Sequence, residues 1–464
     1  MRLYNRYLSP YDVLLVIGDV SLVVCATVAA RSIMVYAGVS DIADWPRWMI
    51  LAGVITILIV TSFYYADLYK IDQTLSRREL TLRFINGFGI ACLIIGLVSY
   101  PYQEAGAKNI YLMEVSLIGV GLFAWRVFFT TLLRKAKCRG KFLILGLQEI
   151  GKQVSEQLYL QKHLGLKVVG FVGAEAGSIT LTYGNPRLVT MPVFPRDSIL
   201  SIADMNEVSR ILVAEGNGNF PGQDLVTLRL KGMPIEDCHT FYERLMSKIS
   251  ITDLHPGWIA RSDGFRRTRW VIFSKRVIDI VVSALGLALS APIAALTAIA
   301  IRLDSVGPII YRQERVGENE QPFILYKFRS MSQDAEAASG PCWAEKNDLR
   351  VTRVGKFIRH LRIDEIPQML NVLKGEMSFV GPRPERPFFV NGLKKLIPYY
   401  HLRFSVKPGI TGWAQVSYKY GASADDAVEK LQYDLYYLKH MSPIFDLQIL
   451  FETVKVVLLS RGAQ

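Results

Sequence analysis

Charged residues are scarce in this 464-residue chain, and its cysteines and histidines do not cluster. Only 20% of the residues are charged, against about 25% in ordinary soluble domains. The five cysteines form no CxxC pair and the six histidines are scattered, so neither a disulfide framework nor a zinc site is expected. No homeodomain, zinc-finger or RNA-recognition signature is present. The net charge of +13 therefore favours an anionic membrane surface or phosphorylated substrates over nucleic acid.

Long apolar runs are what the chain has instead, and 51% of its residues are hydrophobic. Four stretches with few charges lie near residues 11–35, 48–65, 84–100 and 110–133. Each has about the 17–25 residues that a helix needs to cross a bilayer. We therefore expect a four-helix transmembrane bundle over residues 1–136. Few charges lie inside the spans: Asp12, Asp19, Arg31, Glu114 and Arg126. Most of them are near the span ends, where they can snorkel or pair, so a structural role is favoured over a transport pathway.

Basic residues are distributed unevenly around the four predicted spans. They precede the first span, separate the second from the third and follow the fourth: Arg2, Arg6, Lys70, Arg77, Arg78, Arg83, Arg134, Lys135, Lys137, Arg139 and Lys141. Because loops rich in Lys and Arg stay on the cytoplasmic side, both ends of the bundle are predicted to face the cytoplasm.

Residues 137–255 change to a rhythm of short apolar runs alternating with helix-like stretches. The runs 142–145, 168–172 and 211–213 predict strands, and 150–164 predicts a helix, which together indicate a Rossmann-like α/β domain with a parallel sheet. Gly146 and Gly151 follow the first strand, but Gln148 stands where a dinucleotide fingerprint needs its second glycine. A structural or regulatory role is therefore favoured over NAD binding, and any ligand of this domain stays open.

A third region, 256–464, is predicted to be an α-rich catalytic domain that opens with an apolar helix near residues 275–302. Both flanks of this helix are basic, and Pro292 lies near its middle, where the ring removes a helical hydrogen bond. We expect a re-entrant helix that enters the inner leaflet, bends at Pro292 and returns. The alternative is a plain fifth span, since proline is tolerated in spanning helices.

Asp364 and Glu365 carry the strongest chemical signal. Pro367 predicts the start of a helix, which would place both carboxylates at its positive end, and a helix cap is the simplest interpretation. Adjacent carboxylates repel each other, however, and arginines surround them. Arg383 follows in a rigid turn between Pro382 and Pro384, and guanidinium suits bidentate phosphate contact. A phosphate substrate with a divalent metal would reconcile these charges.

Five motifs occur in order and together resemble the bacterial sugar transferase family, the polyprenyl-phosphate hexose-1-phosphate transferases. They lie at 302–308, 326–331, 362–368, 381–385 and 407–413. The resemblance covers the family's catalytic module almost completely. The spans and the α/β region resemble its large, multi-domain members, which implies a multi-pass protein of the bacterial inner membrane with a cytoplasmic catalytic domain.

The resemblance implies a phosphoglycosyl transferase reaction. A UDP-hexose, with glucose or galactose favoured, gives hexose 1-phosphate to undecaprenyl phosphate, UMP is released, and exopolysaccharide, O-antigen or capsule synthesis begins. Asp364 would be the nucleophile that forms a phosphosugar aspartyl intermediate, and Glu365, with Asp364, would hold Mg²⁺ or Mn²⁺. The expected phosphate- or substrate-binding set is Lys327, Arg329, Arg359, Arg362, Pro382, Arg383 and Pro384.

Alternatives stay open beside this interpretation. A membrane scaffold or sensor with a nucleotide-binding α/β domain would leave the carboxylates dispensable, and a direct glycosyl transferase would release UDP instead of UMP. A homodimer is a further expectation, as is contact with inner-membrane lipids. One departure from the family concerns the re-entrant bend, where Ser-Pro is common. Here Ala291 precedes Pro292, so Ser290 would have to bond the freed carbonyl from one position earlier.

Overall fold

The computed structural model divides the chain into two compact units, residues 1–241 and 242–464. It describes residues 2–3, 6–7, 10–36, 38, 45–69, 77–99, 108–135, 140–161, 165–182, 188–214, 222–332, 350–418, 421 and 423–458. The expected domain boundary at 136/137 lies outside these residues, as do Lys70, Lys137 and Arg139 among the basic residues that flank the predicted spans.

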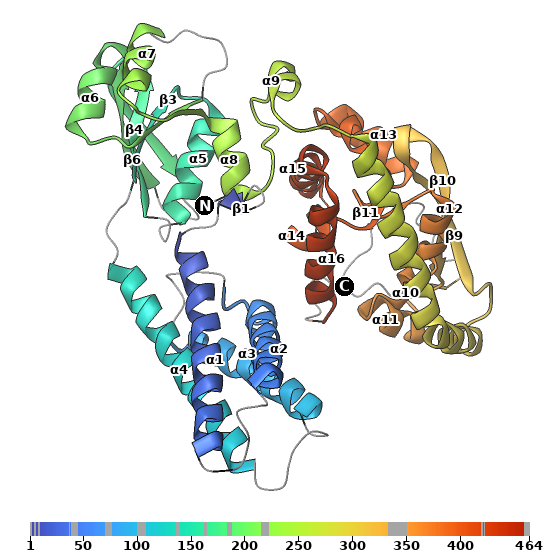
Figure 1. Ribbon diagram of the computed structural model, residues 1–464. Helices are drawn as coiled ribbons and strands as arrows, with labels where there is room; N and C mark the ends of the chain where they lie inside the picture. The colour runs from blue at the N-terminus through green and yellow to red at the C-terminus, as the bar shows by residue number, and fades with distance from the viewer. Residues whose placement is uncertain are drawn as a thin grey trace. The chain divides into compact units, whose positions relative to one another are not determined.

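The first unit begins with a short antiparallel pair, β1 (Arg2–Leu3) and β2 (Arg6–Tyr7), followed by four apolar helices. These helices are α1 (Pro10–Tyr36), α2 (Trp45–Tyr65), α3 (Arg77–Ser99) and α4 (Lys108–Lys135), one at each predicted span. In Figure 1, α1 and α4 run side by side, and α2 packs against α3. Of the described helices, α1, α3, α4 and the later α10 are long and apolar enough to cross a membrane, whereas the apolar part of α2 is shorter, at Met49–Tyr65.

Two of the charges inside the bundle form a buried ion pair. Arg126 on α4 forms an ion pair with Asp19 on α1, and both side chains are buried. The Tyr69 hydroxyl donates to Asp19 Oδ2 at 2.8 Å, and Arg126 Nη1 donates to the Leu68 carbonyl at 2.6 Å. Arg126 also lies over the Phe63 and Tyr69 rings. One cation therefore faces one anion, with aromatic rings around them.

The rest of the first unit is built on a mixed six-stranded sheet. Its strand order is β5-β6-β4-β3-β7-β8, parallel throughout except that β5 pairs antiparallel with β6. The strands are β3 (Gly140–Leu145), β4 (Leu166–Gly173), β5 (Gly177–Thr182), β6 (Leu188–Pro195), β7 (Arg210–Val213) and β8 (Ile235–Asp237), and the helices are α5 (Glu149–Leu160), α6 (Ile199–Met205), α7 (Gly222–Leu230) and α8 (Cys238–Met246). The three predicted strands and the predicted helix are confirmed, and the β5 hairpin is an addition.

Alternate residues of β3 face opposite sides of this sheet, as the period of a strand requires. Leu143 and Leu145 join the core cluster that contains residues of α6 and α7. Phe142 meets Phe241 of α8, with ring centroids 5.4 Å apart. Figure 1 shows helices on both faces of the sheet, which is why its central strands are almost entirely apolar.

The second unit combines short helices with two small sheets. β9 (Ile310–Val316) pairs antiparallel with β10 (Pro322–Phe328), and β11 (Ser378–Val380) pairs parallel with β12 (Gly409–Thr411). The helices are α9 (Pro256–Arg261), α10 (Arg269–Asp304), α11 (Arg353–His360), α12 (Gln368–Lys374), α13 (Pro387–Leu396), α14 (Trp413–Ser417), α15 (Ala424–His440) and α16 (Pro443–Leu458).

One large apolar core holds the second unit together, and residues 242–255 contribute to it. Ile249 and Leu254 are buried there with Trp413 and with Leu431, Leu435 and other residues of α15. The Trp413 indole donates to the Ser247 carbonyl at 2.8 Å. These contacts explain why this segment groups with the second unit, although the sequence predicts a domain boundary only at 255/256.

Helix α10 is one continuous apolar helix with Pro292 inside it. Figure 1 shows that it changes direction toward its C-terminal end. Near its start, Lys275 Nζ donates to the Val380 carbonyl at 2.7 Å, and near its end the Ile301 carbonyl accepts from Arg329 at 3.4 Å. Ser290 Oγ donates to the Leu287 carbonyl at 3.5 Å, rather than to the carbonyl that the proline ring frees.

Candidate active site

Asp364 and Glu365 lie in a single 3₁₀ turn, Ile363–Glu365, which immediately precedes α12. The turn follows Arg362, whose backbone adopts a left-handed conformation with φ 58°. The sequence places the carboxylates in the first turn of the new helix, whereas the helix itself begins at Gln368. Their side chains are only 9% and 10% exposed, so burial makes their charge dependent on nearby partners.

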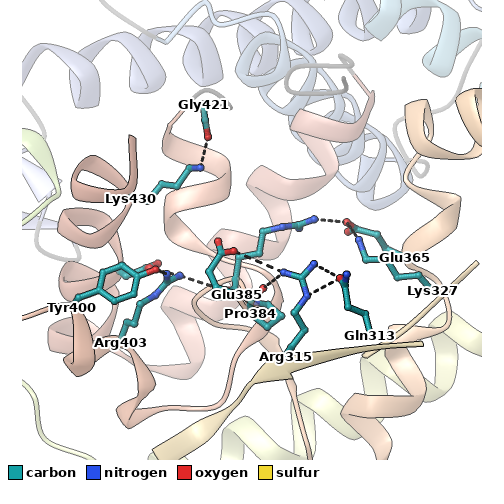
Figure 2. A network of polar contacts seen from close by, with 12 residues as sticks. Gln313, Arg315, Lys327, Glu365, Pro384, Glu385, Tyr400, Arg403, Gly421 and Lys430 are labelled. Atoms are coloured by element: carbon teal, nitrogen blue, oxygen red, sulfur yellow. Dashed lines mark hydrogen bonds and ion pairs between the residues drawn. The ribbon is translucent and has the colours of Figure 1, made fainter. Parts of the chain in front are cut away.

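Three cations converge on one oxygen of Glu365. Arg383 Nη2 lies 2.8 Å from Oε1, and Lys327 Nζ and Arg362 Nη1 each lie 3.4 Å from it. Figure 2 shows Lys327 beside Glu365 at one edge of the polar network. Burial by itself would raise the pKa of Glu365, but the three cations outweigh it and hold that pKa well below its usual range.

Asp364 has a different environment one residue earlier. Its only ion pair within the described chain is with Lys327, at 3.9 Å from Oδ2. Burial raises the pKa of Asp364, and the neighbouring Glu365 adds to the rise, against the opposing effect of Lys327. Burial also lowers the pKa of Lys327, although both carboxylates counteract this. Adjacent carboxyls thus differ in proton affinity, a pattern typical of groups with different chemical roles.

Arg383 is presented by a tightly held turn. The four consecutive carbonyls of residues 382–385 each accept a hydrogen bond, at 2.8, 3.0, 3.0 and 2.9 Å in order. Their donors are, in the same order, the N–H of Gly409, the guanidinium of Arg403, the guanidinium of Arg315 and the N–H of Val316. Two of the four holding contacts therefore come from arginine side chains.

Close backbone approach brings the motifs at 381–385 and 407–413 together. The first motif follows β11 and the second contains β12, and these two strands pair in parallel. A Cβ on Gly409 would lie 2.1 Å from the Gly381 nitrogen, and a Cβ on Gly381 would lie 2.5 Å from the Lys407 carbonyl oxygen. Only glycine allows this contact, which explains why glycine recurs in both motifs.

Lys327 reaches the carboxylates from β10, which a buried asparagine ties to α12. Asn371 Nδ2 donates to the Ile324 carbonyl at 2.7 Å, and its Oδ1 accepts from the Tyr326 N–H at 3.1 Å. This side chain is fully buried. It fixes the strand that carries Lys327 relative to the helix that follows Glu365.

Two residues of the predicted phosphate-binding set lie elsewhere. Arg329 is buried and donates to the carbonyls of Ser305 and Val306, at 2.8 and 3.0 Å, so its guanidinium closes the end of α10. Arg359 occupies the last turn of α11 and makes no hydrogen bond or ion pair with either carboxylate in the described residues. Pro382 and Pro384 flank Arg383, and their rings restrict the backbone of the turn that carries it.

The second oxygens of the two carboxylates are open. Within the part of the chain that the structure describes, Asp364 Oδ1 and Glu365 Oε2 make no hydrogen bond or ion pair. Carboxylate oxygens are the ligands that Mg²⁺ prefers, and one or two of them with water and substrate phosphate suffice. Among described residues, no cluster of three or more acidic, His or Cys side chains forms a complete metal cage. The pair fits a metal shared with a phosphate ligand.

Sequence reasoning missed the residues that hold this site: Arg315, Asn371, Arg403 and Asp434. A signal for two of them exists in hindsight. Arg403 lies in an aromatic stretch with Tyr400 and Phe404, and Asp434 is the acid between Tyr433 and Tyr436. A lone charge among aromatic residues indicates a buried ion pair.

The second unit thus combines a carboxylate pair surrounded by cations with a helix, α10, that is long and apolar enough to cross a membrane. Residues 270–460 match the sequence profile of the family described as bacterial sugar transferase. The exopolysaccharide production protein PSS of Rhizobium leguminosarum bv. phaseoli is 41% identical over 193 residues, which cover 40% of this chain and 96% of that protein. The chain belongs to the bacterial sugar transferase family.

Two further relatives differ in how much of their length is matched. The UDP-N-acetylgalactosamine-undecaprenyl-phosphate N-acetylgalactosaminephosphotransferase of Aeromonas hydrophila is 41% identical over 240 residues, which cover 52% of this chain and 56% of the relative. The chain thus spans about half of that protein's length. The UDP-glucose:undecaprenyl-phosphate glucose-1-phosphate transferase of Xanthomonas campestris pv. campestris is 26% identical over 479 aligned positions, covering 100% of this chain and 96% of the relative.

Proposed function

We propose that this protein is a phosphoglycosyl transferase that moves hexose 1-phosphate from a UDP-hexose to undecaprenyl phosphate and releases UMP. The observation that carries the proposal is the unlike environment of two adjacent buried carboxylates. Glu365 is matched by three cations, and Asp364 by one cation at 3.9 Å. A carboxylate with few partners and an open oxygen is suited to nucleophilic attack.

The proposed reaction proceeds in two displacements. Oδ1 of Asp364 attacks the phosphorus that bears the sugar, the bond between this phosphorus and the bridging oxygen breaks, and UMP leaves with the electron pair. A phosphate oxygen of the lipid then attacks the same phosphorus, and the carboxylate of Asp364 leaves unchanged. One diphosphate linkage, in the UDP-hexose, is broken and another, in the lipid product, is formed, so no net proton is consumed. Splitting the exchange keeps two anionic substrates from having to react directly.

The cations around Glu365 support binding of an anionic diphosphate. Three positive side chains, Lys327, Arg362 and Arg383, face two carboxylates, which leaves a surplus of one positive charge. A guanidinium presents paired donors to phosphate oxygens, and Arg383 is the one on a rigid turn. We assign Arg383 and Lys327 to the charge that develops on the transferred phosphate.

We further propose that Glu365, together with Asp364, holds Mg²⁺, with Mn²⁺ as a substitute. The open oxygens Oε2 and Oδ1 are the ligands the chain offers. When bound, the ion would offset charge on the diphosphate. Within the chain itself, the contact of Glu365 with Arg383 orients both groups before substrate arrives.

The contacts of α10 support a re-entrant helix on the cytoplasmic face of the inner membrane. Residues near both ends of the helix contact the same catalytic unit, at Val380 and at Arg329. Between them, Leu285, Leu289 and Leu296 are exposed. A helix that crossed the bilayer would carry its ends to opposite sides, whereas a bent one returns them to one side. The active site would then lie where a lipid phosphate and a soluble nucleotide-sugar meet.

The experiment that tests the proposal measures the nucleotide product. Purified full-length protein is incubated with undecaprenyl phosphate, Mg²⁺ and a panel that includes UDP-glucose, UDP-galactose and UDP-N-acetylgalactosamine. We expect UMP from at least one donor, and loss of about 1000-fold or more in turnover for Asp364→Asn, because an amide cannot attack phosphorus. Asp425→Asn, an exposed acid in the first turn of α15, is the matched control.

A second measurement examines the intermediate. With radiolabelled donor and no lipid acceptor, label should stay on the protein, be released by hydroxylamine, and be absent from Asp364→Asn. Release of UDP in place of UMP would mean direct glycosyl transfer. Turnover that survives in Asp364→Asn would reject the nucleophile, and no nucleotide release from any donor would favour a scaffold or sensor.

A further inference from the structure

The turn that carries Arg383 is held from inside by a buried arginine. Arg403 is 6% exposed and lies in the 3₁₀ segment Tyr400–Ser405. Its Nη2 donates to the Arg383 carbonyl at 3.0 Å, and its Nη1 donates to the Tyr400 hydroxyl at 2.6 Å. Figure 2 shows Arg403 beside Tyr400, on the opposite side of the network from Glu365. Arg403 therefore touches the backbone of Arg383 and neither carboxylate of the site.

Asp434 of α15 provides the counter-charge for Arg403. Its Oδ2 lies 3.0 Å from Arg403 Nη2, and its side chain is 2% exposed. Burial raises the pKa of Asp434 to about 6, Arg403 opposes the rise, and Glu385 adds to it while Lys430 reduces it. A buried ion pair is often replaceable by apolar residues without loss of stability. Stability alone therefore does not explain why the Arg403–Asp434 pair is present.

A second arginine holds the next carbonyl of the turn. Arg315 on β9 donates to the Pro384 carbonyl at 3.0 Å, and its Nε and Nη2 donate to Gln313 Oε1 at 3.1 and 2.6 Å. Figure 2 shows Arg315 between Gln313 and the turn at Pro384. The outer two carbonyls are held by backbone N–H groups, so the middle of the turn, where Arg383 sits, depends on Arg403 and Arg315.

We propose that Arg403, fixed by Asp434, and Arg315 are positioning residues that aim the Arg383 guanidinium at Glu365 and at the phosphate of the donor. This role deepens the proposed function and rests on it. A methionine in place of either arginine can fill the space but donates no hydrogen bond. The turn would then lose its central support, and displacement of a substrate-gripping group by about 1 Å lowers turnover by about 100-fold.

A double-mutant cycle distinguishes positioning from general stabilisation. Arg403→Met and Arg315→Met are each made in the full-length chain and again in the Arg383→Lys background, and UMP release is measured over a range of donor concentrations. In the natural background we expect each to lower kcat by about 10- to 100-fold. In Arg383→Lys the same changes should cost less than about 3-fold, because the group they aim is already gone. Lys395→Met, at an exposed position in α13, is the control.

A further variant guards against loss of activity that comes only from misfolding. Arg403→Met leaves Asp434 buried without its cation, so Arg403→Met/Asp434→Leu, which removes both charges, is made beside it. Thermal unfolding reports whether each variant is folded. A kcat within 2-fold of the natural chain in folded Arg315→Met and in the folded double variant would overturn the proposal, as would an equal loss in both backgrounds. Absence of UMP release from the natural chain would instead reject the proposed function.

Discussion

Two buried charge clusters of this molecule differ in how completely they are matched. In the helix bundle, one cation, Arg126, faces one anion, Asp19, so their charges cancel. A tyrosine donates to Asp19 and a backbone carbonyl accepts from Arg126, whereas Asp19 Oδ1 has no hydrogen-bond partner among the described residues. In the catalytic unit, three cations face two carboxylates, and an oxygen on each carboxylate is open. The first cluster neutralises itself inside an apolar environment. The second cluster carries a surplus of positive charge that an anionic ligand would neutralise.

The difference shows how burial alone fails to mark a functional site. Asp19 is fully buried and Asp364 is 7% exposed, so exposure does not separate them. Asp19 Oδ1 has no hydrogen-bond partner among the described residues either, so an unpartnered carboxylate oxygen does not separate them. What separates them is the surplus of positive charge around Asp364 and Glu365, which only a ligand of opposite sign would satisfy. Substitutions in the two clusters should accordingly affect different properties.

After the loss of the proposed nucleophile itself, the largest effect expected in this comparison comes from removing the guanidinium geometry of the site. Arg383→Lys keeps the positive charge but not the paired donors, and it should lower kcat for UMP release by about 100-fold. The enzyme should stay folded, because the backbone contacts of the turn do not involve this side chain. Steady-state kinetics on the natural and variant chains measure the effect. A variant with unchanged kcat and raised KM would instead assign Arg383 to ground-state binding alone.

Much of the fold can be predicted from the sequence because its signals are local. Apolar runs predict α1 to α4, short apolar runs predict β3, β4 and β7, and the apolar helix with its internal proline appears as α10. The β5 hairpin is not among the predicted strands, although Ile179 and Leu181 alternate with threonines there, because the run is short and only half apolar. The start of α12 was placed too early, because Pro367 favours a first helical turn that here serves as the cap.

The candidate site can be predicted only in part, for a related reason. Asp364, Glu365 and Arg383 stand out as motif residues, and the Arg383 side chain does meet Glu365. Arg329 has the same local signal as Lys327, two positions apart in one motif, yet one closes α10 and the other reaches Glu365. Strand alternation cannot separate the two, because residues two positions apart share a face. Arg329 follows the last residue of β10, and only the tertiary packing brings its guanidinium to the end of α10. Arg403 and Asp434 each stand out as a charge among aromatic residues, but they lie far apart in the sequence, so nothing local predicts that they pair with each other.

An intermediate effect is expected from pH. Asp364 must be ionised to attack, and burial raises its pKa, so kcat/KM should fall about tenfold per unit of pH once the pH drops below that raised value. Lys327 must be protonated to match the carboxylates, and burial lowers its pKa, so activity should also fall on the alkaline side earlier than an ordinary lysine would allow. We therefore expect a bell-shaped plot of kcat/KM against pH, which is narrower than ordinary carboxyl and lysine pKa values would give.

Lys327→Arg sharpens this expectation. Arginine stays charged at every accessible pH, so the alkaline limb should move to higher pH while the acid limb remains. Lys327→Met removes the cation nearest Asp364, which should shift the acid limb to higher pH as well as reduce activity. Profiles of kcat/KM between pH 5 and 10 separate these outcomes. An alkaline limb that does not move in Lys327→Arg would show that another group produces it.

The smallest effect on catalysis is expected from the self-neutralised cluster, where stability should change instead. Arg126→Met leaves Asp19 buried without its cation and should lower the free energy of unfolding in detergent by about 3 kcal/mol or more, because an uncompensated buried charge is costly. Arg126→Met/Asp19→Leu removes both charges and should recover most of that loss. In both variants, kcat per folded molecule should stay within about 2-fold of the natural value, because a structural pair contributes nothing to the transition state. A bundle substitution that reduced kcat without reducing stability would contradict this and would couple the bundle to the reaction.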